Sequence, residues 1–65
     1  MGALSMEKVG ELLGTTDLAG NAQERQVLAV RIAELVELNG EEWVRENRRM
    51  LLDQWRRVVE LKTIG

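Results

Sequence analysis

Two long helical patterns, over residues 22–38 and 41–62, are separated only by Asn39-Gly40, and the chain has no proline to interrupt either of them. Asn and Gly tolerate the left-handed backbone that ends a helix abruptly. Because the junction is so short, the second helix has to turn back beside the first. The sequence therefore predicts an all-α protein built on an antiparallel helical hairpin of about residues 21–38 and 41–62.

A shorter helix is expected before the hairpin, over residues 5–13. Ser5 is placed to cap its N-terminus and Gly14 to end it. Gly10 in its middle costs about 1 kcal/mol relative to Ala. The segment is nevertheless patterned as a helix with one apolar face.

The start of the first long helix has two candidate caps. Asn21 and Glu24 have the spacing of a capping box, in which each side chain accepts a hydrogen bond from the other residue's backbone N–H. Thr16 is the rival, and it would start the helix about four residues earlier.

Apolar residues lie on two sides of this helix. One side is the usual core face and carries Leu28, Ile32, Leu35 and Val36. The other side carries Val27, Val30 and Leu38. A hairpin partner covers a single face, so the second face predicts another neighbour, either the N-terminal helix or another subunit. Scattered exposed valines, which are common on soluble proteins, are the alternative.

The size of the chain favours self-association. Its 65 residues make one small domain, residues 1–65. Met6 is an alternative natural start, in which case residues 1–5 are an added or disordered segment. A chain this short buries only about 60% of its unfolded surface, and small folds are usually reinforced by disulfides, metals or oligomerisation. No cysteine or histidine is present. We therefore expect a homodimer that completes a helical bundle.

The last helical pattern carries the stripe predicted to form the oligomer interface. Two amides interrupt its apolar positions seven residues apart, and polar residues in a helix seam are best known for fixing register and oligomer state. The alternatives are a slightly rotated helix, solvated ends of the seam, or a grip on a ligand. The two tryptophans are expected in a core or subunit interface rather than an external site. The predicted interface residues are Trp43, Asn47, Leu51, Gln54, Trp55 and Val58.

A basic face on the same helix is the candidate for nucleic-acid binding. Arg45, Arg49 and Arg56 share one polar side, but acidic residues alternate with them at spacings of three and four, typical of a solvated face with ion pairs. The net charge is -2, whereas nucleic-acid binders are usually basic. Nucleic-acid binding is therefore the alternative function, not the expected one.

Catalysis, cofactors and metals are not expected. Without histidine or cysteine the chain lacks the commonest general base and the commonest metal ligands, and it has no glycine-rich phosphate loop. The chain has no run of about 18 apolar residues, so no membrane span is predicted, and no secretory signal is recognisable. The expected location is the cytoplasm.

The architecture is similar to that of small helical hairpins that dimerise into four-helix bundles, such as the plasmid copy-number regulator Rop, but a shared architecture does not carry function. We expect a non-catalytic homo-oligomer that acts as a protein-protein interaction or regulatory module. A partner protein would recognise apolar surface that the bundle leaves open, such as Val27, Val30 and Leu38.

Overall fold

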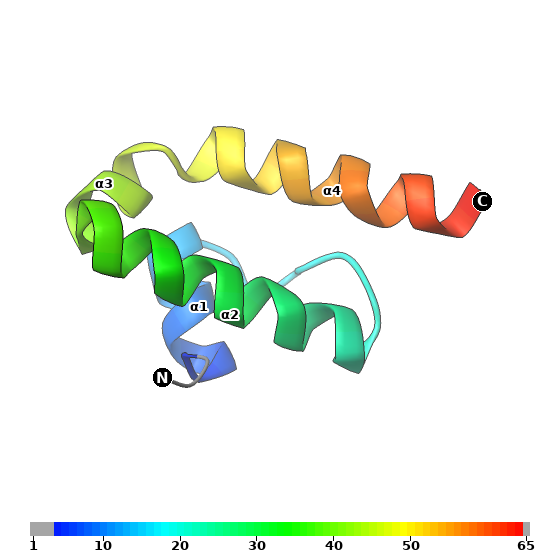
Figure 1. The fold of residues 1–65 in the computed structure, drawn as a ribbon, viewed down its shortest axis with the longest axis horizontal. Coiled ribbons are helices and arrows are strands. Elements are labelled where there is room, and N and C mark those ends of the chain that lie inside the picture. The colour runs from blue at the N-terminus through cyan, green and yellow to red at the C-terminus, as the bar shows by residue number, and fades with distance from the viewer. Residues whose placement is uncertain (1–3, 65) are drawn as a thin grey trace.

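A computed structural model describes residues 4–64, with the backbone alone for residues 62–64. Within this range the chain forms four helices: α1 over Met6–Leu13, α2 over Ala22–Asn39, α3 over Glu41–Glu46 and α4 over Arg48–Ile64 (Figure 1). No strand occurs in this part of the chain. The all-α prediction is confirmed. The prediction of one continuous helix over 41–62 is wrong, because the helix breaks at Asn47.

The predicted caps of α1 are confirmed. Its N-terminus is capped by Ser5, whose Oγ accepts a hydrogen bond from the backbone N–H of Lys8 at 3.2 Å. At the other end Gly14 has a left-handed φ of 76°, and the N–H groups of Gly14 and Thr15 both donate to the Gly10 carbonyl. A Cβ on Gly10 would lie 3.2 Å from the Thr15 carbonyl oxygen. Glycine inside α1 thus leaves room for the close approach of the following connector.

The predicted boundaries of α2 are also confirmed. Asn21 and Glu24 form both hydrogen bonds of a capping box, at 2.8 and 2.9 Å, so Thr16 is not the cap. The junction after α2 depends on Gly40, which has φ 91° and ψ 159°, a region that is essentially restricted to glycine. One residue thus ends α2 and starts α3.

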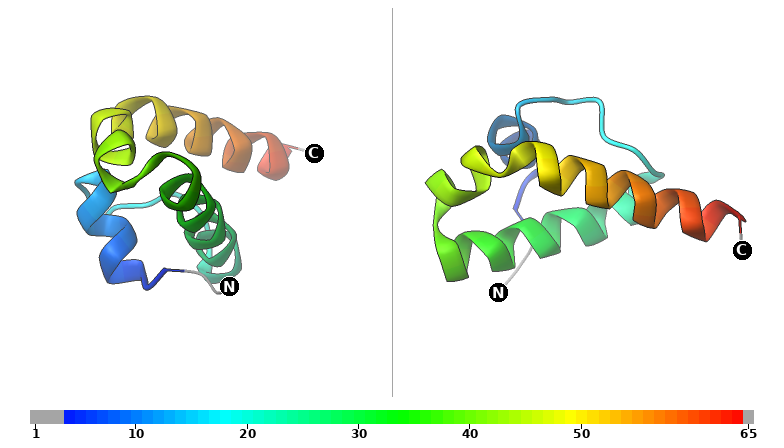
Figure 2. Two further views of the ribbon diagram at one scale, coloured as in Figure 1. Left: turned by 60° about the vertical axis from the view of Figure 1, so that its left-hand side comes forward. Right: turned by 90° about the horizontal axis from the view of Figure 1, so that it is seen from above.

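Side-chain hydrogen bonds to the backbone accompany the break between α3 and α4. The Asn47 amide Nδ2 donates to the Trp43 carbonyl at 2.8 Å, and Arg48 Nη1 donates to the Arg45 carbonyl at 2.8 Å. Short polar side chains that bond to nearby carbonyls compete with the helical backbone, and cationic side chains can satisfy the last carbonyls of a helix. As a result α3 packs against α1 and α2, and α4 leaves in a direction of its own (Figure 2).

The core joins α1 to each of the other three helices, and α3 likewise contacts the other three. Leu4, just before it, also packs against the core, and residues 1–3 lie outside the described residues. Every buried side chain in residues 4–61 is apolar. The buried hydrophobic residues are Val9, Leu12, Leu13, Leu18, Leu28, Ala29, Ile32, Val44 and Trp55.

The hairpin itself is open. The chain direction reverses between α2 and α4, as predicted, but the backbones of these two helices barely approach each other (Figures 1 and 2). Instead α1 and α3 pack against α2, and Trp55 of α4 reaches the connector before α2, where its Nε1–H donates to the Ala19 carbonyl at 2.9 Å. Side chains of α2 and α4 are thus left facing a space between the helices.

Candidate interaction groove

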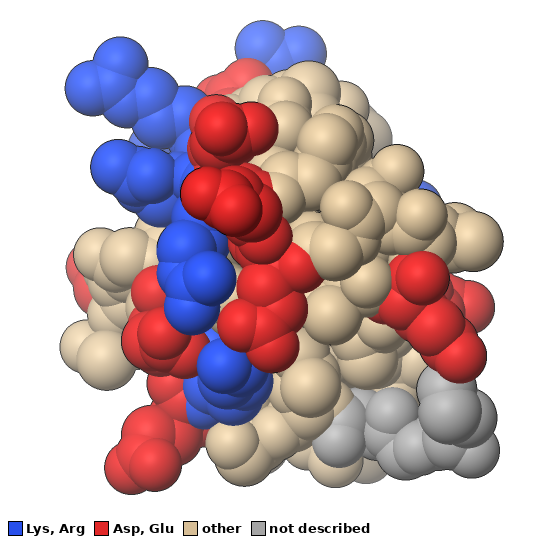
Figure 3. Space-filling model, turned by 90° about the vertical axis from the view of Figure 1, so that its left-hand side faces the viewer, with Lys and Arg blue, Asp and Glu red and all other residues tan. Residues whose placement is uncertain are grey.

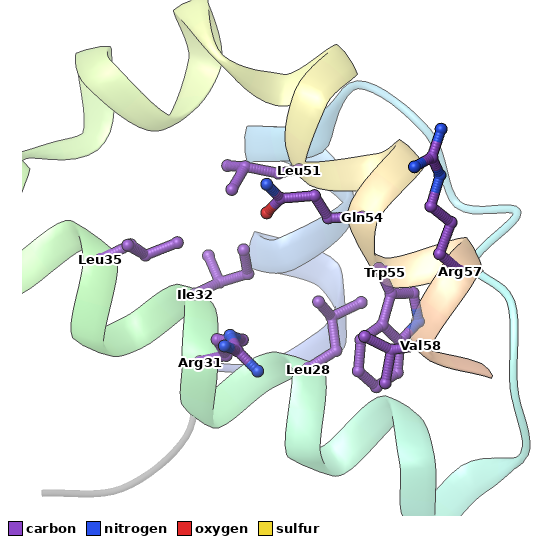
Figure 4. Close-up of a pocket in the computed structure, with 9 residues that line it drawn as sticks. All are labelled: Leu28, Arg31, Ile32, Leu35, Leu51, Gln54, Trp55, Arg57 and Val58. Carbon is purple, nitrogen blue, oxygen red and sulfur yellow. The ribbon is translucent and has the colours of Figure 1, made fainter. Parts of the chain in front are cut away.

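A groove lies between α2 and α4 and is lined mainly by apolar side chains; the Gln54 amide points into the space between the two helices, and the Arg57 side chain points away from it (Figure 4). Its volume is about 270 Å³, just below the roughly 300–1,000 Å³ of typical small-molecule pockets. The α2 wall consists of Leu28, Arg31, Ile32 and Leu35. The α4 wall consists of Leu51, Gln54, Trp55, Arg57 and Val58. An open apolar groove between two helices has the form that accepts the apolar face of a third helix.

Four of the six residues predicted for the oligomer interface lie on the α4 wall of this groove: Leu51, Gln54, Trp55 and Val58. The other two, Trp43 and Asn47, lie outside it. Trp43 is partly buried against the core, and the Asn47 amide bonds to its own helix. The break at Asn47 therefore divides the predicted stripe between two helices, and it brings only the α4 part to the groove.

Trp55 belongs to the core and to the groove at once. It is only 6% exposed, and its indole N–H donates a hydrogen bond to the Ala19 carbonyl of the connector. One edge of its ring remains at the groove beside Val58, which is 37% exposed. Burial within a single chain agrees with the prediction that this tryptophan supplies core area.

The α2 wall was not predicted as part of a site. The sequence pattern placed Leu28, Ile32 and Leu35 on the buried face of α2, which they do occupy: Leu28 and Ile32 are buried and Leu35 is partly buried. The sequence gives no sign that α4 stays away from this face. The break at Asn47 is the nearest signal, because an amide that bonds to its own helix redirects the segment after it.

The second apolar side of α2 is exposed. Val27 is 52%, Val30 44% and Leu38 81% exposed, so the N-terminal helix does not cover this side within the chain. Covering by another subunit remains a prediction. The groove and this exposed side are separate surfaces of the same helix.

Four charged side chains join α1 to α3. On the face of the molecule shown in Figure 3, Lys and Arg lie beside Asp and Glu. Arg45 Nη2 lies 2.7 Å from Glu11 Oε1 and 3.5 Å from Glu41, and Lys8 Nζ lies 3.1 Å from Glu11 and 3.2 Å from Glu41. Hydrogen bonds from Arg45 and then Lys8 lower the pKa of Glu11. Hydrogen bonds to Glu11 and then Glu41 raise the pKa of Lys8, and the bond to Glu11 raises the pKa of Arg45. The cluster holds two helices together.

This cluster also divides the predicted basic face. Arg45 lies on α3 and is occupied by two carboxylates, whereas Arg49 and Arg56 are exposed on α4, beyond the break. Acidic residues spaced three or four positions from the arginines form ion pairs in part: Glu41–Arg45 and Asp53–Arg57 form, both at 3.5 Å. Arg56 makes no ion pair with residue 60 within the described residues. The three arginines thus do not make one continuous surface.

Few features of a reaction centre occur in the described part of the chain. No group of three or more acidic residues there is arranged to hold a metal ion, and no buried side-chain nitrogen or oxygen lacks a hydrogen-bond partner. The ion pairs between α1 and α3 shift the pKa values of Lys8, Glu11 and Arg45. Among the described helices, none has the length and apolar character needed to cross a bilayer.

Comparisons with known proteins add no function to this geometry. No protein-family model matches the chain, and neither the curated proteins nor the solved structures contain a significant match.

Proposed function

We propose that this protein is a non-catalytic, homo-oligomeric interaction module, and that its groove between α2 and α4 binds an amphipathic helix of a partner protein. The observation that carries the proposal is the open hairpin. Leu28, Leu35, Leu51 and Val58 face one another across a space that no other element of the described chain fills. Desolvating such a surface contributes about 25 cal/mol for each Å² of apolar area buried.

Charge defines the helix that the groove accepts. The α4 segment carries five basic and two acidic residues, whereas the rest of the chain carries four basic and nine acidic ones. Arg31 lies on the α2 edge of the groove and makes no ion pair within the described residues, whereas Arg57 on the α4 side pairs with Asp53 at 3.5 Å. Complementary charge speeds association and selects partners. The expected occupant therefore has an apolar face flanked by Glu or Asp.

Exposed apolar surface elsewhere supports the homo-oligomeric part of the proposal. Leu38, Val27 and Val30 remain open to solvent in a chain whose core is limited by its size. Association of copies through such surface makes the melting temperature rise with protein concentration. Analytical ultracentrifugation together with thermal melts over a wide concentration range tests this part. A monomer with a concentration-independent melt contradicts it.

A synthetic helix tests the groove. The probe is a peptide with Leu at helical positions i, i+3, i+4 and i+7 and Glu on either side, and the control is the same peptide with Lys for Glu. Trp43→Phe leaves Trp55 as the only fluorophore, at the wall of the groove. We expect the Glu peptide to change Trp55 fluorescence saturably and the Lys peptide to bind at least about tenfold more weakly, because like charges oppose docking.

Two matched variants separate the groove from the rest of α4. Val58→Glu places a carboxylate in the groove, and Leu61→Glu places one on an exposed part of the same helix, where the side chain is 70% exposed. Only Val58→Glu should abolish binding of the Glu peptide. Equal effects of the two variants, or equal binding of the Glu and Lys peptides, would contradict the proposed groove.

A second candidate function is nucleic-acid binding through the basic α4, whose exposed arginines outside ion pairs include Arg49 and Arg56 of the predicted basic face. Phosphate binding releases counterions, so affinity must fall steeply with salt and must be lost when both arginines become Gln. We expect weak binding or none to a 20-base single strand or duplex near physiological salt. Submicromolar, salt-sensitive binding that needs both arginines would favour this function instead.

A further inference from the structure

The side of α2 that faces away from the core has a regular order of residues. Val27, Arg31, Glu34 and Leu38 follow one another at spacings of four, three and four and are all exposed. These are the spacings of a coiled-coil seam, in which every residue meets a neighbouring helix. We call these four residues the outer stripe of α2. It has apolar ends and two opposite charges in the middle.

The charges of the outer stripe have no ion-pair partner within the described chain. Arg31 and Glu34 make no salt bridge there, unlike the four charged side chains that join α1 to α3. Both charges lie between exposed apolar residues, where a second helix would cover them. Their natural partners are therefore a carboxylate and a guanidinium on another chain.

The stripe is complementary to itself when two copies of α2 run antiparallel. With a two-fold axis between residues 32 and 33, Val27 faces Leu38 of the partner subunit, and Arg31 faces Glu34 of the partner subunit. The axis repeats each contact, so the interface has two apolar contacts at its ends and two ion pairs in its middle. Seam positions of antiparallel helices meet in this order, and the order fixes one register.

Other arrangements of the same two helices lose this match. Parallel pairing in register places Arg31 against Arg31 and Glu34 against Glu34, which is repulsive. If one copy of α2 is shifted by one turn along the other, the antiparallel register changes. A shift one way places Glu34 of one chain against Val27 of the other, and a shift the opposite way places Arg31 of one chain against Leu38 of the other. Burying a charge against an apolar side chain is costly. The antiparallel pairing about residues 32 and 33 is thus selected by charge.

We propose that the outer stripe of α2 is the self-association surface of this protein, and that a second copy of the chain occupies it in antiparallel orientation. The proposal rests on the homo-oligomeric function proposed above and names the surface that carries it. A helix of 18 residues is about 27 Å long, so a single pair buries less than the roughly 1,200 Å² of standard interfaces. The expected dimer is weak and dynamic.

Charge reversal tests the pairing in the full chain by sedimentation equilibrium. Glu34→Arg gives an interface with four cations and Arg31→Glu one with four anions, so each variant should associate at least about tenfold more weakly. An equimolar mixture of the two variants places opposite charges on the two chains and should form a heterodimer. The chain that carries both substitutions should dimerise like the original protein.

A matched control separates interface charge from overall charge. Glu60→Arg makes the same change as Glu34→Arg on α4, where residue 60 is exposed, and it should leave dimerisation unchanged. Far-UV circular dichroism of each variant establishes that the fold is kept. Arg31 also lies on the edge of the groove between α2 and α4, whereas Glu34 does not line it, so the Glu34 variant is the one that reports on the stripe without disturbing the other surface.

Cysteine pairing gives an independent readout, because the natural chain contains no cysteine. A mixture of the Val27→Cys and Leu38→Cys chains should oxidise mainly to the mixed disulfide, since these positions face each other in the proposed dimer. Each variant alone should cross-link more slowly. Equal cross-linking of all combinations would overturn the antiparallel register.

The outcomes distinguish this inference from the proposed function. If the protein dimerises but both single charge reversals leave the dimer intact, or mixing them restores nothing, the outer stripe is not the surface and the inference fails. If Val58→Glu abolishes that dimer, copies meet at the groove, and the homo-oligomeric function stands without the stripe. If the protein stays monomeric up to near-millimolar concentration, the homo-oligomeric part of the function fails as well.

Discussion

Replacing Trp55 by Phe tests whether α4 is fastened to the connector before α2. The indole N–H donates to the Ala19 carbonyl at 2.9 Å, and the ring is 6% exposed. Phe keeps most of the apolar contact but leaves this carbonyl without its donor. A net hydrogen bond is worth about 0.5–1.5 kcal/mol, and the Ala19 carbonyl is only partly buried, so its loss of a donor costs less than the roughly 1–3 kcal/mol of a fully buried acceptor. We expect Trp55→Phe to lower the free energy of unfolding by about 1–2 kcal/mol.

Urea denaturation at a single protein concentration, followed by far-UV circular dichroism, measures this loss. With a slope of about 1 kcal/mol per molar urea for a small domain, the midpoint should fall by about 1–2 M. Trp55→Ala also removes the buried ring and should cost about 3–5 kcal/mol. The two variants together separate the hydrogen bond from the packing.

Trp43 provides the matched control. It is partly buried, and its indole makes no hydrogen bond within the described residues, so Trp43→Phe should shift the midpoint by less than half as much. The reasoning is refuted if Trp43→Phe and Trp55→Phe have the same effect, or if Trp55→Phe leaves the midpoint unchanged. In either case the bond to Ala19 would not hold α4 in place.

Three further predictions concern backbone geometry and pH. Gly10→Ala should lower the melting temperature despite the higher helix propensity of Ala, because the added Cβ would lie 3.2 Å from the Thr15 carbonyl; a rise would contradict this. Gly40→Ala should cost about 1–3 kcal/mol in urea denaturation although its Cβ meets nothing within 4 Å, because φ is 91° and ψ 159°; a neutral result would show that the junction adapts. Hydrogen bonds from Arg45 and then Lys8 lower the pKa of Glu11 on folding. The Glu11 carboxylate therefore stabilises the fold above its ordinary pKa, and this stabilisation is lost as the pH falls through the pKa of Glu11 in the folded protein. Glu11→Gln should flatten the acid limb of a melting temperature against pH profile, and an unchanged limb would exclude this group as a cause.

Local sequence features predicted most of the helix boundaries. Ser5, Gly14 and Asn21 cap the helices as their residue types indicate, because each acts through hydrogen bonds or backbone angles within a few residues. The Gly40 junction was predictable for the same reason. The break at Asn47 is local as well, but Asn is tolerated inside helices, and only the bond from its side chain to the Trp43 carbonyl marks the break.

The candidate site could be predicted only in part. The stripe of Leu51, Gln54 and Val58 was recognised from its spacing, but the surface opposite it was expected to be a subunit rather than α2 of the same chain. Spacing shows which residues share a helix face. It does not show the angle at which two helices cross, and that angle decides whether two apolar faces close on each other or leave a groove.

The sequence by itself determined the all-α class, the caps, the reversal at Gly40 and the apolar faces, because these follow from propensities and periodicities that act within a few residues. Tertiary structure decided that α1 packs against the other three helices, that the backbones of α2 and α4 barely approach each other, and that Trp55 reaches back to Ala19. These outcomes depend on contacts between residues far apart in the sequence, such as Glu11 with Arg45 and Trp55 with Ala19, where packing selects among several apolar faces. The open groove and the exposed outer stripe of α2 are what that packing leaves uncovered.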